Sequence, residues 1–351
     1  MKVLMAPADK GGCGFYRMFF PGRVLSAIEP GVEVRFDQHL PIRVQRDVNF
    51  NPVKVTGVGD IDADVLVLQR PLQRILAEAI PHFQKSGVTV VVDLDDDFSC
   101  LHSSHGARHL YNPRLNKDEN YLHLAKACAR ADLLTVSTPA LADRYGKRGN
   151  AVVLRNCVPE RYTSVKRHSN GRTIGWSGFT TMHPDDLQVT RGGVRDALES
   201  RDRFLCVGNG LDVKEHLDLR HEVEATGPLP LSGYPDGIAK IDVGIVPLAD
   251  TKFNAAKSWL KGLEFAAVGT SVVASPTAEY VELAKHIPVL LARRSREWKR
   301  HIRALLDHPE LRKEWVEQSQ ATILRDHTYE TQSWRWAEVW EAARQRMKVP
   351  A

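Results

Sequence analysis

Two consecutive series of short apolar runs, alternating with longer helix-like stretches, constrain this chain more than any other feature of its sequence. In the first half, the runs that read as buried strands are KVLMAP (2–7), VEVRF (32–36), DVLVLQ (64–69), VTVVVDLD (88–95), LLTVS (133–137) and AVVLRN (151–156). The second half repeats the pattern with RTIGWSG (172–178), RFLCVG (203–208), VEATG (223–227), DVGIVPL (242–248), TSVVAS (270–275) and IPVLLA (287–292). Such alternation is typical of parallel sheets that helices cover on both faces.

The two series predict an α/β protein with two doubly wound, Rossmann-like domains. The length agrees, because 351 residues are about twice the size of a usual domain. The weakest stretch between the series is polar and rich in turn formers, so we expect a linker near 159–171. We expect an N-terminal domain at 1–165, a C-terminal domain at 166–328 and a terminal helix at 329–351. Trp336 and Trp340 lie one turn apart on that helix and are expected to pack against a neighbouring domain.

Composition places the chain among intracellular globular proteins. No run approaches the ~20 apolar residues of a membrane span, and the short apolar run at the N-terminus does not resemble a signal peptide. The five cysteines are scattered and form no CxxC pair, which argues against a zinc site or a disulfide framework and favours the cytoplasm.

The net charge of +5 permits an acidic partner without demanding one. The basic stretch ARRSREWKRHIR (292–303) reads as a solvated helix face, or alternatively as a phosphate-binding patch for nucleic acid.

The stretch MAPADKGGCGFYR (5–17) places three glycines directly after the first predicted strand. In an open α/β sheet, ligands bind beyond the carboxyl ends of the strands, which is where these glycines lie. Gly11, Gly12 and Gly14 can take positive φ and bring backbone N–H groups close to a ligand. A helix that starts behind them favours an anion such as a phosphate. A tight turn between strand and helix explains the same residues, because the spacing matches neither the dinucleotide fingerprint nor a Walker loop.

The strongest local signal is VPLADTKFNAAKSWLKGLEFAAVGTSVVAS (246–275) in the second half. Laid on one helix, five polar residues share an arc, namely Asn254, Lys257, Ser258, Lys261 and Glu264. The arc could be a solvated face. However, the helix begins just after a strand, so its first half lies at the ligand end of the sheet. There a lysine and a serine suit a diphosphate, and a carboxylate two turns further on can accept hydrogen bonds from a ribose.

This segment resembles the signature of GT-B glycosyltransferases, above all the retaining enzymes of family four. The run LEFAAVGTSVVAS (263–275) is similar to their LE-A-A-x-G-x-PVVA run, and the resemblance makes Glu264 the ribose-binding glutamate. The family's partner glutamate, eight residues earlier, is absent, because Ala256 stands there. We therefore carry over the second glutamate alone. Lys257 is assigned to the diphosphate on charge and position.

Other stretches extend the resemblance over nearly the whole chain. IGWSGFTTMHPDDL (174–187) is similar to the family's loop that faces the donor phosphates, which adds Ser177 and Gly178 to the expected donor-binding residues. TVSTPALADRYGKRGNAVVLRNCVPE (135–160) resembles the end of a GT-B N-terminal domain, and the last helix resembles the one that crosses back to the first domain. The pair PADKGGCGFYR and VDLDDDF also resembles glycosyltransferase-like sequences of actinobacterial phages. By the same resemblance, Arg17 and the three glycines near it contact the donor or an anionic acceptor.

An acidic cluster follows the strand at 88–95, again at the ligand end, and comprises Asp93, Asp95, Asp96 and Asp97. An acidic turn that caps the next helix is one reading, and clustered carboxylates also suit Mg²⁺ or Mn²⁺. The GT-B resemblance implies no metal requirement, so we expect Asp95 and Asp96 to support the acceptor. His102 and His105 follow within reach and are candidates for contact with the transferred sugar, or are solvated loop histidines.

The sequence thus predicts a glycosyltransferase that uses a nucleotide-diphosphate sugar as co-substrate, needs no other cofactor and acts with retention. The expected acceptor is a hydroxyl, for a phage-like enzyme on a virion protein side chain or on a modified DNA base. Lys257, Ser258 and the loop at Ser177 and Gly178 would stabilise the leaving diphosphate. A nucleotide-sugar epimerase of the same fold and a non-catalytic nucleic-acid-binding protein are the competing readings.

Overall fold

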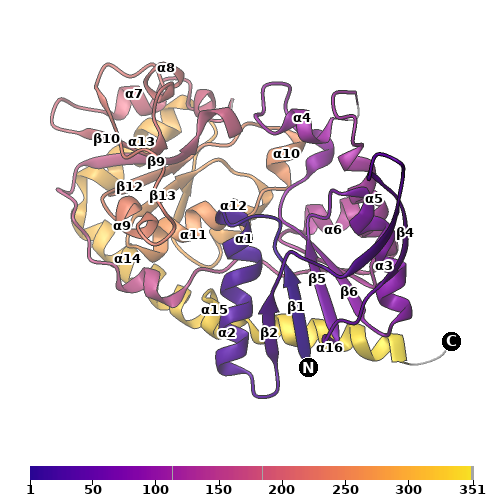
Figure 1. Cartoon of the computed structure of the whole chain (residues 1–351). Coiled ribbons are helices and arrows are strands. Elements are labelled where there is room, and N and C mark those ends of the chain that lie inside the picture. The colour runs from indigo at the N-terminus through magenta and orange to yellow at the C-terminus, as the bar shows by residue number, and fades with distance from the viewer. Residues whose placement is uncertain (113, 184, 349–351) are drawn as a thin grey trace. The chain divides into compact units, whose positions relative to one another are not determined.

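The computed structural model describes residues 1–112, 114–183 and 185–348 (Figure 1). The chain forms two compact units. Unit 1 holds residues 1–101, 107–156 and the C-terminal segment from Gln332 onward, and unit 2 holds residues 102–106 and 157–331.

Unit 1 contains a six-stranded sheet in the order β2-β1-β5-β6-β7-β8, in which every neighbouring pair is parallel. The strands are β1 (Lys2–Ala6), β2 (Glu33–Phe36), β5 (Val65–Gln69), β6 (Thr89–Leu94), β7 (Leu133–Val136) and β8 (Ala151–Val153). Every residue of β5, β6 and β7 is buried, because these strands have neighbours on both sides and their side chains are covered on both faces. All six predicted runs of the first half are therefore strands of one sheet.

The helices of unit 1 lie between these strands in the chain, except the last, which follows all of them. They are α1 (Gly12–Gly14), the π-helical turn η1 (Phe15–Phe19), α2 (Phe20–Ile28), α3 (Arg74–Lys85), the 3-10 turn η2 (Phe98–Cys100), α4 (Arg108–Tyr111), α5 (Asn120–Arg130), α6 (Pro139–Tyr145) and α16 (Trp334–Lys348). The terminal helix α16 contacts β6 and α2. Trp336 and Trp340 on it are buried, which confirms that this helix packs on the first domain.

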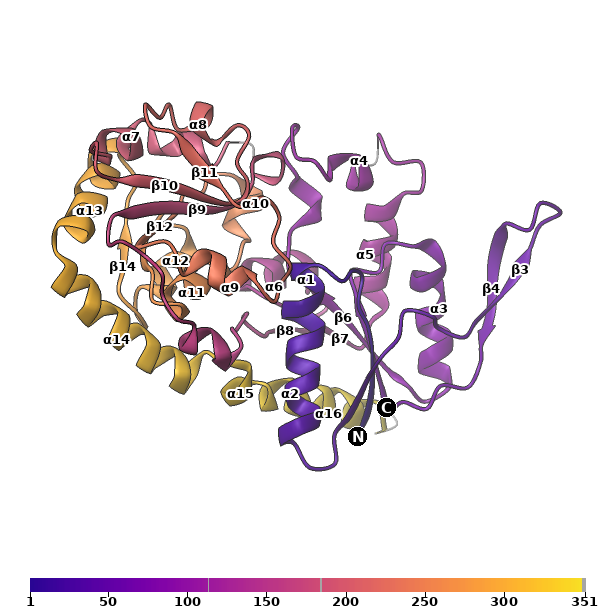
Figure 2. The ribbon, with the colours of Figure 1, turned by 60° about the vertical axis from the view of Figure 1, so that its left-hand side comes forward.

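Unit 1 also carries an antiparallel hairpin that the sequence reading did not predict. Its strands are β3 (Ile42–Arg46) and β4 (Pro52–Val58), and they pair only with each other. Figure 2 shows the hairpin reaching outward past α3, away from the six-stranded sheet of the unit. The alternation of side chains along β3 and β4 was missed because the hairpin is inserted between β2 and β5, two strands of the main series.

Unit 2 repeats the architecture with a parallel sheet in the order β11-β10-β9-β12-β13-β14. The strands are β9 (Thr173–Phe179), β10 (Arg203–Asn209), β11 (Val223–Ala225), β12 (Val243–Val246), β13 (Ser271–Ala274) and β14 (Val289–Leu291). All six predicted runs of the second half are present. Two doubly wound parallel sheets confirm the predicted fold class.

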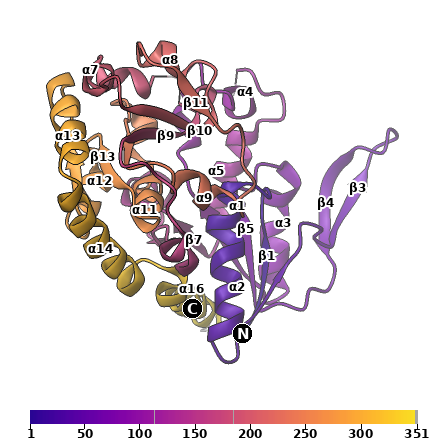
Figure 3. The same cartoon turned by 90° about the vertical axis from the view of Figure 1, so that its left-hand side faces the viewer.

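Helices cover both faces of the second sheet. They are α7 (Gly193–Ala197), α8 (Val213–His216), α9 (Tyr234–Ile238), α10 (Lys252–Ala255), α11 (Leu260–Ala267), α12 (Ala278–Leu283), α13 (Ser295–Asp307), α14 (Pro309–Asp326) and α15 (Tyr329–Gln332), with 3-10 turns η3 (Glu160–Ser164), η4 (Thr180–Met182) and η5 (Leu187–Thr190). One core cluster joins the sheet to residues of α9, α11 and α12, and a second joins it to residues of α7, α8 and α13. Figure 3 shows α13 and α11 at this sheet.

Among the described residues, no helix is long and apolar enough to cross a membrane.

Candidate functional site

The glycine stretch after β1 closes around a side chain of the protein itself. Oδ1 of Asp9 accepts hydrogen bonds from the amides of Gly11 (2.7 Å) and Gly14 (3.2 Å), and its other oxygen pairs with Arg70. Gly11, Gly12 and Gly14 all lack positive φ, contrary to the sequence expectation. Gly14 is required for another reason, because a Cβ there would lie 2.0 Å from the carbonyl oxygen of Asp9. In this structure, a carboxylate therefore already occupies the anion position of the loop.

Arg17 lies in the interior of unit 1 and not at its surface. The side chain is 1% exposed. Its guanidinium donates two hydrogen bonds to Asp93, from Nε at 2.9 Å and from Nη2 at 2.7 Å, and Nη1 donates to Asn156 and to the carbonyl of Leu154. Thr135 donates a further bond to Asp93. We therefore assign Arg17 a structural role, in place of the ligand contact expected from the sequence.

The four members of the acidic cluster have different surroundings. Asp93 accepts hydrogen bonds from the guanidinium of Arg17. Asp97 caps η2 by accepting a hydrogen bond from the amide of Ser99 (3.0 Å). Asp95 lies at the carboxyl end of β6 with Nε of Arg70 3.9 Å from its Oδ1. Both of these atoms are buried and without a hydrogen-bond partner in this structure. Asp95 and Asp96 are thus the members of the cluster that stay candidates for substrate contact.

The two candidate histidines belong to unit 2, since the segment 102–106 packs there. The amide of Gly106 donates to the carbonyl of Thr181 at 2.9 Å, and Nε2 of His102 lies 3.1 Å from a carboxylate oxygen of Asp185. The ring of His105 meets the ring of Phe253 edge-on at 5.2 Å. Burial, and then the positive charge of Lys257, lowers the pKa of His105. His105 is therefore a neutral histidine close to the polar residues of unit 2 described next.

The single helix expected over 254–264 is two helices in the structure. α10 ends at Ala255 and α11 starts at Leu260, so Lys257 and Ser258 lie in the connection between them. Thr251 caps α10 by accepting from the amide of Asn254 at 3.1 Å. The break places these two residues directly before the N-terminus of α11, which a continuous helix would not do.

Asn254 is fixed by a buried carboxylate that the sequence reading did not select. Its Nδ2 donates to Oδ1 of Asp186 at 2.6 Å and to the carbonyl of Ala249 at 3.0 Å. The other oxygen of Asp186 lies 2.8 Å from Nδ1 of His183. Burial lowers the pKa of His183 to about 3, so the imidazole is neutral near pH 7. Burial opposes the charge of Asp186, yet the bond with His183 and the amide of Ala249 keep the pKa of Asp186 below its usual value.

Glu264 stands in a chain of hydrogen bonds that ends at β9. The residue is 5% exposed. Oε2 of Glu264 accepts from the phenol of Tyr234 at 3.0 Å, and that phenol lies 2.9 Å from Oγ of Ser177. Because the phenol has one proton and donates it to Glu264, Ser177 is the donor in the second bond. Burial, and then the charge of Glu264, raises the pKa of Tyr234, so the phenol stays protonated.

Lys261 is the buried cation of the same group. Its ammonium donates to the backbone carbonyl of Ser177 and lies 5.8 Å from the ring centroid of Trp176. Burial lowers the pKa of Lys261 to about 8, against the opposite effect of Glu264. Lys257 carries a second ammonium, 4.4 Å from the ring centroid of Phe253. The structure therefore brings two lysines and one glutamate together at the start of α11.

Two glycines allow β9 and β10 to end close together beside this group. Gly178 has φ of +155°, and Gly208 has φ of +136°. A Cβ on Gly208 would lie 2.2 Å from the carbonyl oxygen of Gly178, and one on Gly178 would lie 2.8 Å from the ring of Trp176. A side chain at Gly208 would therefore push the two strand ends apart, and one at Gly178 would collide with Trp176 of the same strand.

The sequence reading thus found some of the residues that make these contacts in unit 2 and missed others. Ser177, Asn254, Lys257, Ser258, Lys261 and Glu264 were selected, and Tyr234, Asp186 and His183 were missed. Asp186 and His183 lie in the stretch IGWSGFTTMHPDDL, where a histidine three residues before an aspartate was a usable signal. Tyr234 is the first residue of α9, and no pattern in the sequence singles it out. The unit 1 candidates Gly11, Gly12, Gly14, Asp95 and Asp96 lie at the carboxyl ends of β1 and β6.

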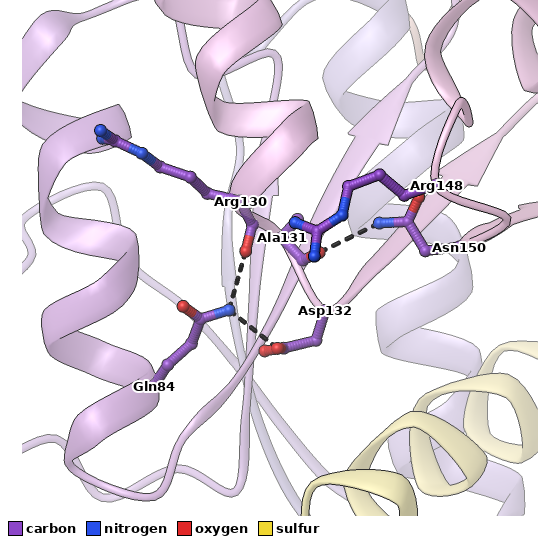
Figure 4. Close-up of a pocket in the computed structure, with 6 residues that line it drawn as sticks. All are labelled: Gln84, Arg130, Ala131, Asp132, Arg148 and Asn150. Carbon is purple, nitrogen blue, oxygen red and sulfur yellow. Dashed lines mark hydrogen bonds between the residues drawn. The ribbon is translucent and has the colours of Figure 1, made fainter.

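A separate cavity of about 540 Å³ lies at the opposite, amino end of β7 (Figure 4). Nε2 of Gln84 donates there to Asp132 and to the carbonyl of Arg130, both at 2.8 Å, and Nδ2 of Asn150 donates to the carbonyl of Ala131. These polar groups bind one another, and ligands of open α/β sheets bind at the other end of the strands. We do not include this cavity in the candidate site.

Comparisons with known proteins bear on the family and the fold. Residues 191–338 match the family described as "Glycosyl transferase-like". No curated protein sequence matches the chain. Among solved structures, HepE of Anabaena is 14% identical, with a TM-score of 0.62 over 97% of this chain and 99% of that one. A glycosyltransferase of Rickettsia africae is 11% identical with a TM-score of 0.63, covering 97% of this chain and 98% of its own. A sucrose-phosphate synthase of Thermosynechococcus elongatus is 10% identical with a TM-score of 0.65 and the same coverage.

These similarities span both units and show that the chain has the GT-B fold. Identities this low carry the fold and not the activity.

Proposed function

We propose that this protein is a glycosyltransferase that moves a sugar from a nucleotide-diphosphate donor to an acceptor hydroxyl. The observation that carries the proposal is Glu264, a buried carboxylate held by Tyr234 at a sheet end where two lysines also gather. The GT-B fold and the glycosyl transferase-like match over 191–338 support it.

In this proposal unit 2 binds the donor. Glu264 accepts hydrogen bonds from the ribose hydroxyls, as the family resemblance implies. Lys257 and Ser258 precede the N-terminus of α11, where the positive end of the helix dipole favours a diphosphate. Lys261 adds positive charge beside them, and the tight strand ends at Ser177 and Gly178 leave backbone within reach of the same phosphates. Asn254, which is bonded to Asp186, fixes the turn that presents Lys257.

The bond changes require no nucleophilic side chain. The bond between the anomeric carbon and the diphosphate oxygen breaks, and a bond from the acceptor oxygen to the same carbon forms. On the retaining route the acceptor approaches on the face that the diphosphate leaves, and its proton passes to an oxygen of the leaving phosphate. Lys257 and Lys261 stabilise the negative charge that develops there.

We assign the acceptor to residues of the carboxyl ends of β1 and β6, with Asp95 and Asp96 supporting the hydroxyl. Gly11, Gly12 and Gly14 shape the loop beside them, and His102 and His105 contact the transferred sugar. The phage-like sequence pattern favours a virion protein side chain or a hydroxylated DNA base as the acceptor.

Donor binding tests the proposal directly. The HepE structures are described as complexes with UDP and with UDP-glucose, so uridine donors come first in a panel of nucleotide sugars. We expect one donor to raise the melting temperature of the wild type, because a ligand of the native state stabilises it. The Glu264→Gln variant should show a smaller shift with the same donor. Absence of any shift with all donors would contradict the proposal.

Turnover separates the competing functions. Conversion of the donor to an epimer with no acceptor present would identify an epimerase. Binding to duplex DNA that weakens steeply with salt, without donor binding, would identify a nucleic-acid-binding protein.

A further inference from the structure

The hairpin β3-β4 has no part in the proposed donor or acceptor site. It is inserted between β2 and β5 and extends outward from the unit in Figure 2. The hairpin is attached along β4, because Val55 is buried and Arg74 of α3 donates to the backbone carbonyls of Pro52 and Val53, next to the turn. The hairpin is therefore a fixed projection of unit 1.

The tip of the hairpin displays two apolar side chains to solvent. Val48 is 94% exposed and Phe50 is 79% exposed. Single exposed apolar residues are common on proteins. Two large ones, separated by one residue at the end of a projecting ribbon, form an apolar point that the rest of the unit does not cover.

Hydrogen bonds hold the tip in one shape. Oδ1 of Asp47 accepts from the amides of Asn49 and Asn51, each at 2.8 Å. The guanidinium of Arg46 donates to the carbonyl of Phe50 at 2.7 Å. Phe50 has φ of +63°, a conformation that bulky residues rarely adopt. The turn is thus specified by its bonds even though they force an unfavourable backbone on an exposed aromatic residue.

Positive charge lies directly behind the tip. Residues 42–58 contain three cations, Arg43, Arg46 and Lys54, and one carboxylate, Asp47, so the net charge is 3 − 1 = +2. The carboxylate is occupied by the amides of the turn. Lys54 pairs with Gln45 and Arg43 with Gly57 in the ladder, whereas Val44 pairs with the buried Val55. Because side chains alternate between the faces of a strand, Gln45 and Lys54 are on the opposite face from Val44 and Val55.

We propose that this hairpin is a docking device for an anionic lipid bilayer. Val48 and Phe50 enter the interface between headgroups and acyl chains, and the three cations behind them contact headgroup phosphates. An anionic bilayer has charged headgroups at its surface and apolar acyl chains beneath them. An apolar tip with basic residues behind it matches this order, because the tip reaches the acyl chains while the basic residues stay at the headgroups. A nucleic acid fits less well, because three cations neutralise few phosphates and Val48 has no ring to stack on a base. The proposal does not depend on the proposed enzymatic activity.

Co-sedimentation with lipid vesicles tests it. We expect the wild type to bind vesicles of equal parts phosphatidylcholine and phosphatidylserine. The double variant Val48→Ser/Phe50→Asn should lower the partition coefficient about a hundredfold, since each apolar side chain removed from lipid contributes roughly tenfold. Asparagine tolerates the positive φ of position 50, so the turn is preserved. Thermal unfolding of the variant provides the check on folding.

Two further variants separate the contributions. Leu211→Ser is the matched control, because Leu211 is an 83% exposed apolar residue of unit 2, and it should leave binding unchanged. Arg43→Gln/Lys54→Gln should weaken binding to the mixed vesicles by roughly twentyfold, at about fivefold per cation, and should not change binding to pure phosphatidylcholine.

The proposal is overturned by three outcomes. These are absence of vesicle binding by the wild type, equal loss in the Leu211→Ser control, and full binding by the Val48→Ser/Phe50→Asn variant. If the same double variant instead abolished binding to duplex DNA while vesicles were not bound, the hairpin would be a nucleic-acid contact and not a membrane one.

Discussion

The phenol of Tyr234 donates a 3.0 Å hydrogen bond to the carboxylate of Glu264, although the two residues are 30 positions apart in the sequence. The bond joins the start of α9 to the middle of α11 on the same side of the unit 2 sheet. It fixes one oxygen of Glu264 and so orients the carboxylate that we assign to the donor ribose.

Replacing Glu264 by glutamine should weaken donor binding while the shape of the side chain is kept. Loss of a hydrogen bond to a charged group costs about 1.5 to 3 kcal/mol, or roughly ten- to a hundredfold in dissociation constant. Titration calorimetry with the donor from the thermal-shift panel measures this change. Glu282→Gln on the neighbouring α12, whose glutamate pairs with Lys285, is the control and should bind as the wild type does.

A 2′-deoxy donor gives a sharper version of the same experiment. The wild type should bind it more weakly than the ribose donor, and Glu264→Ala should discriminate much less between the two. Equal discrimination by both proteins would show that this glutamate does not hold the ribose.

Tyr234→Phe should act through Glu264 and leave the fold intact, because the ring is retained and only the hydroxyl is removed. We expect the donor dissociation constant to rise by roughly tenfold, in line with the loss of one charged hydrogen bond of about 1.5 kcal/mol. In the Glu264→Ala background the same substitution should have little further effect. Additive losses in a double-mutant cycle would contradict the positioning role.

Lys261 should make stability depend on pH in a defined window. Its pKa is about 8 in the folded protein and 10.5 for an unperturbed lysine, so the unfolded chain binds more protons between these values. The free energy of unfolding should therefore rise as the pH increases from 8 to 10.5, by about 3 kcal/mol for this group. Urea unfolding at both ends of the window measures the change. The Lys261→Met variant should show a smaller rise by that amount, and an identical rise in both proteins would exclude the shifted pKa.

Donor binding should respond to the same titration in the opposite sense. Above pH 8 the Lys261 ammonium loses its charge, so attraction to a diphosphate weakens. Affinity measured across pH 7 to 9 should fall more in the wild type than in Lys261→Met.

Arg17 provides a test of a structural against a ligand-binding role. Arg17→Met leaves Asp93 buried without its ion pair, which should lower the free energy of unfolding by about 3 to 5 kcal/mol. Donor affinity of the folded fraction should stay at the wild-type value. If the variant instead has normal stability and weakened donor binding, the result would support the phosphate contact of Arg17 that the sequence suggested.

The glycine loop offers a matched pair. Gly12→Ala should leave stability unchanged, since nothing lies within 4 Å of the added Cβ, whereas Gly14→Ala meets the carbonyl of Asp9 at 2.0 Å. Thermal unfolding should therefore separate the two, with a lower melting temperature for Gly14→Ala alone. If Gly12 shapes the acceptor side, Gly12→Val should lose transfer and keep donor binding.

The strands of both sheets were open to prediction, because hydrophobic runs determine them locally. All twelve predicted runs became strands, since a parallel sheet buries both faces of a strand and so demands continuous apolar residues. The carboxyl ends of these runs then made Asp95 and the residues before α11 candidates for ligand contact, and the family resemblance added Ser177.

The partners of these residues were not open to prediction, because they depend on distances across the fold. Nothing near Tyr234 in the sequence points to Glu264, and nothing near Arg17 points to Asp93, 76 positions away. The break between α10 and α11 was equally hidden, since the helical arc through Asn254 and Glu264 continues across it.

The sequence by itself therefore determined the two α/β domains, the terminal helix and the ends of the sheets where chemistry is expected, because these follow from patterns of apolar residues over a few positions. The tertiary structure alone determined which charged groups bind other groups of the protein. Asp9, Asp93 and Asp97 look like Asp95 in the sequence. In the structure the first three accept hydrogen bonds from amides or from a guanidinium, whereas Oδ1 of Asp95 is buried 3.9 Å from Arg70 without a hydrogen-bond partner, and only distances across the fold decide this.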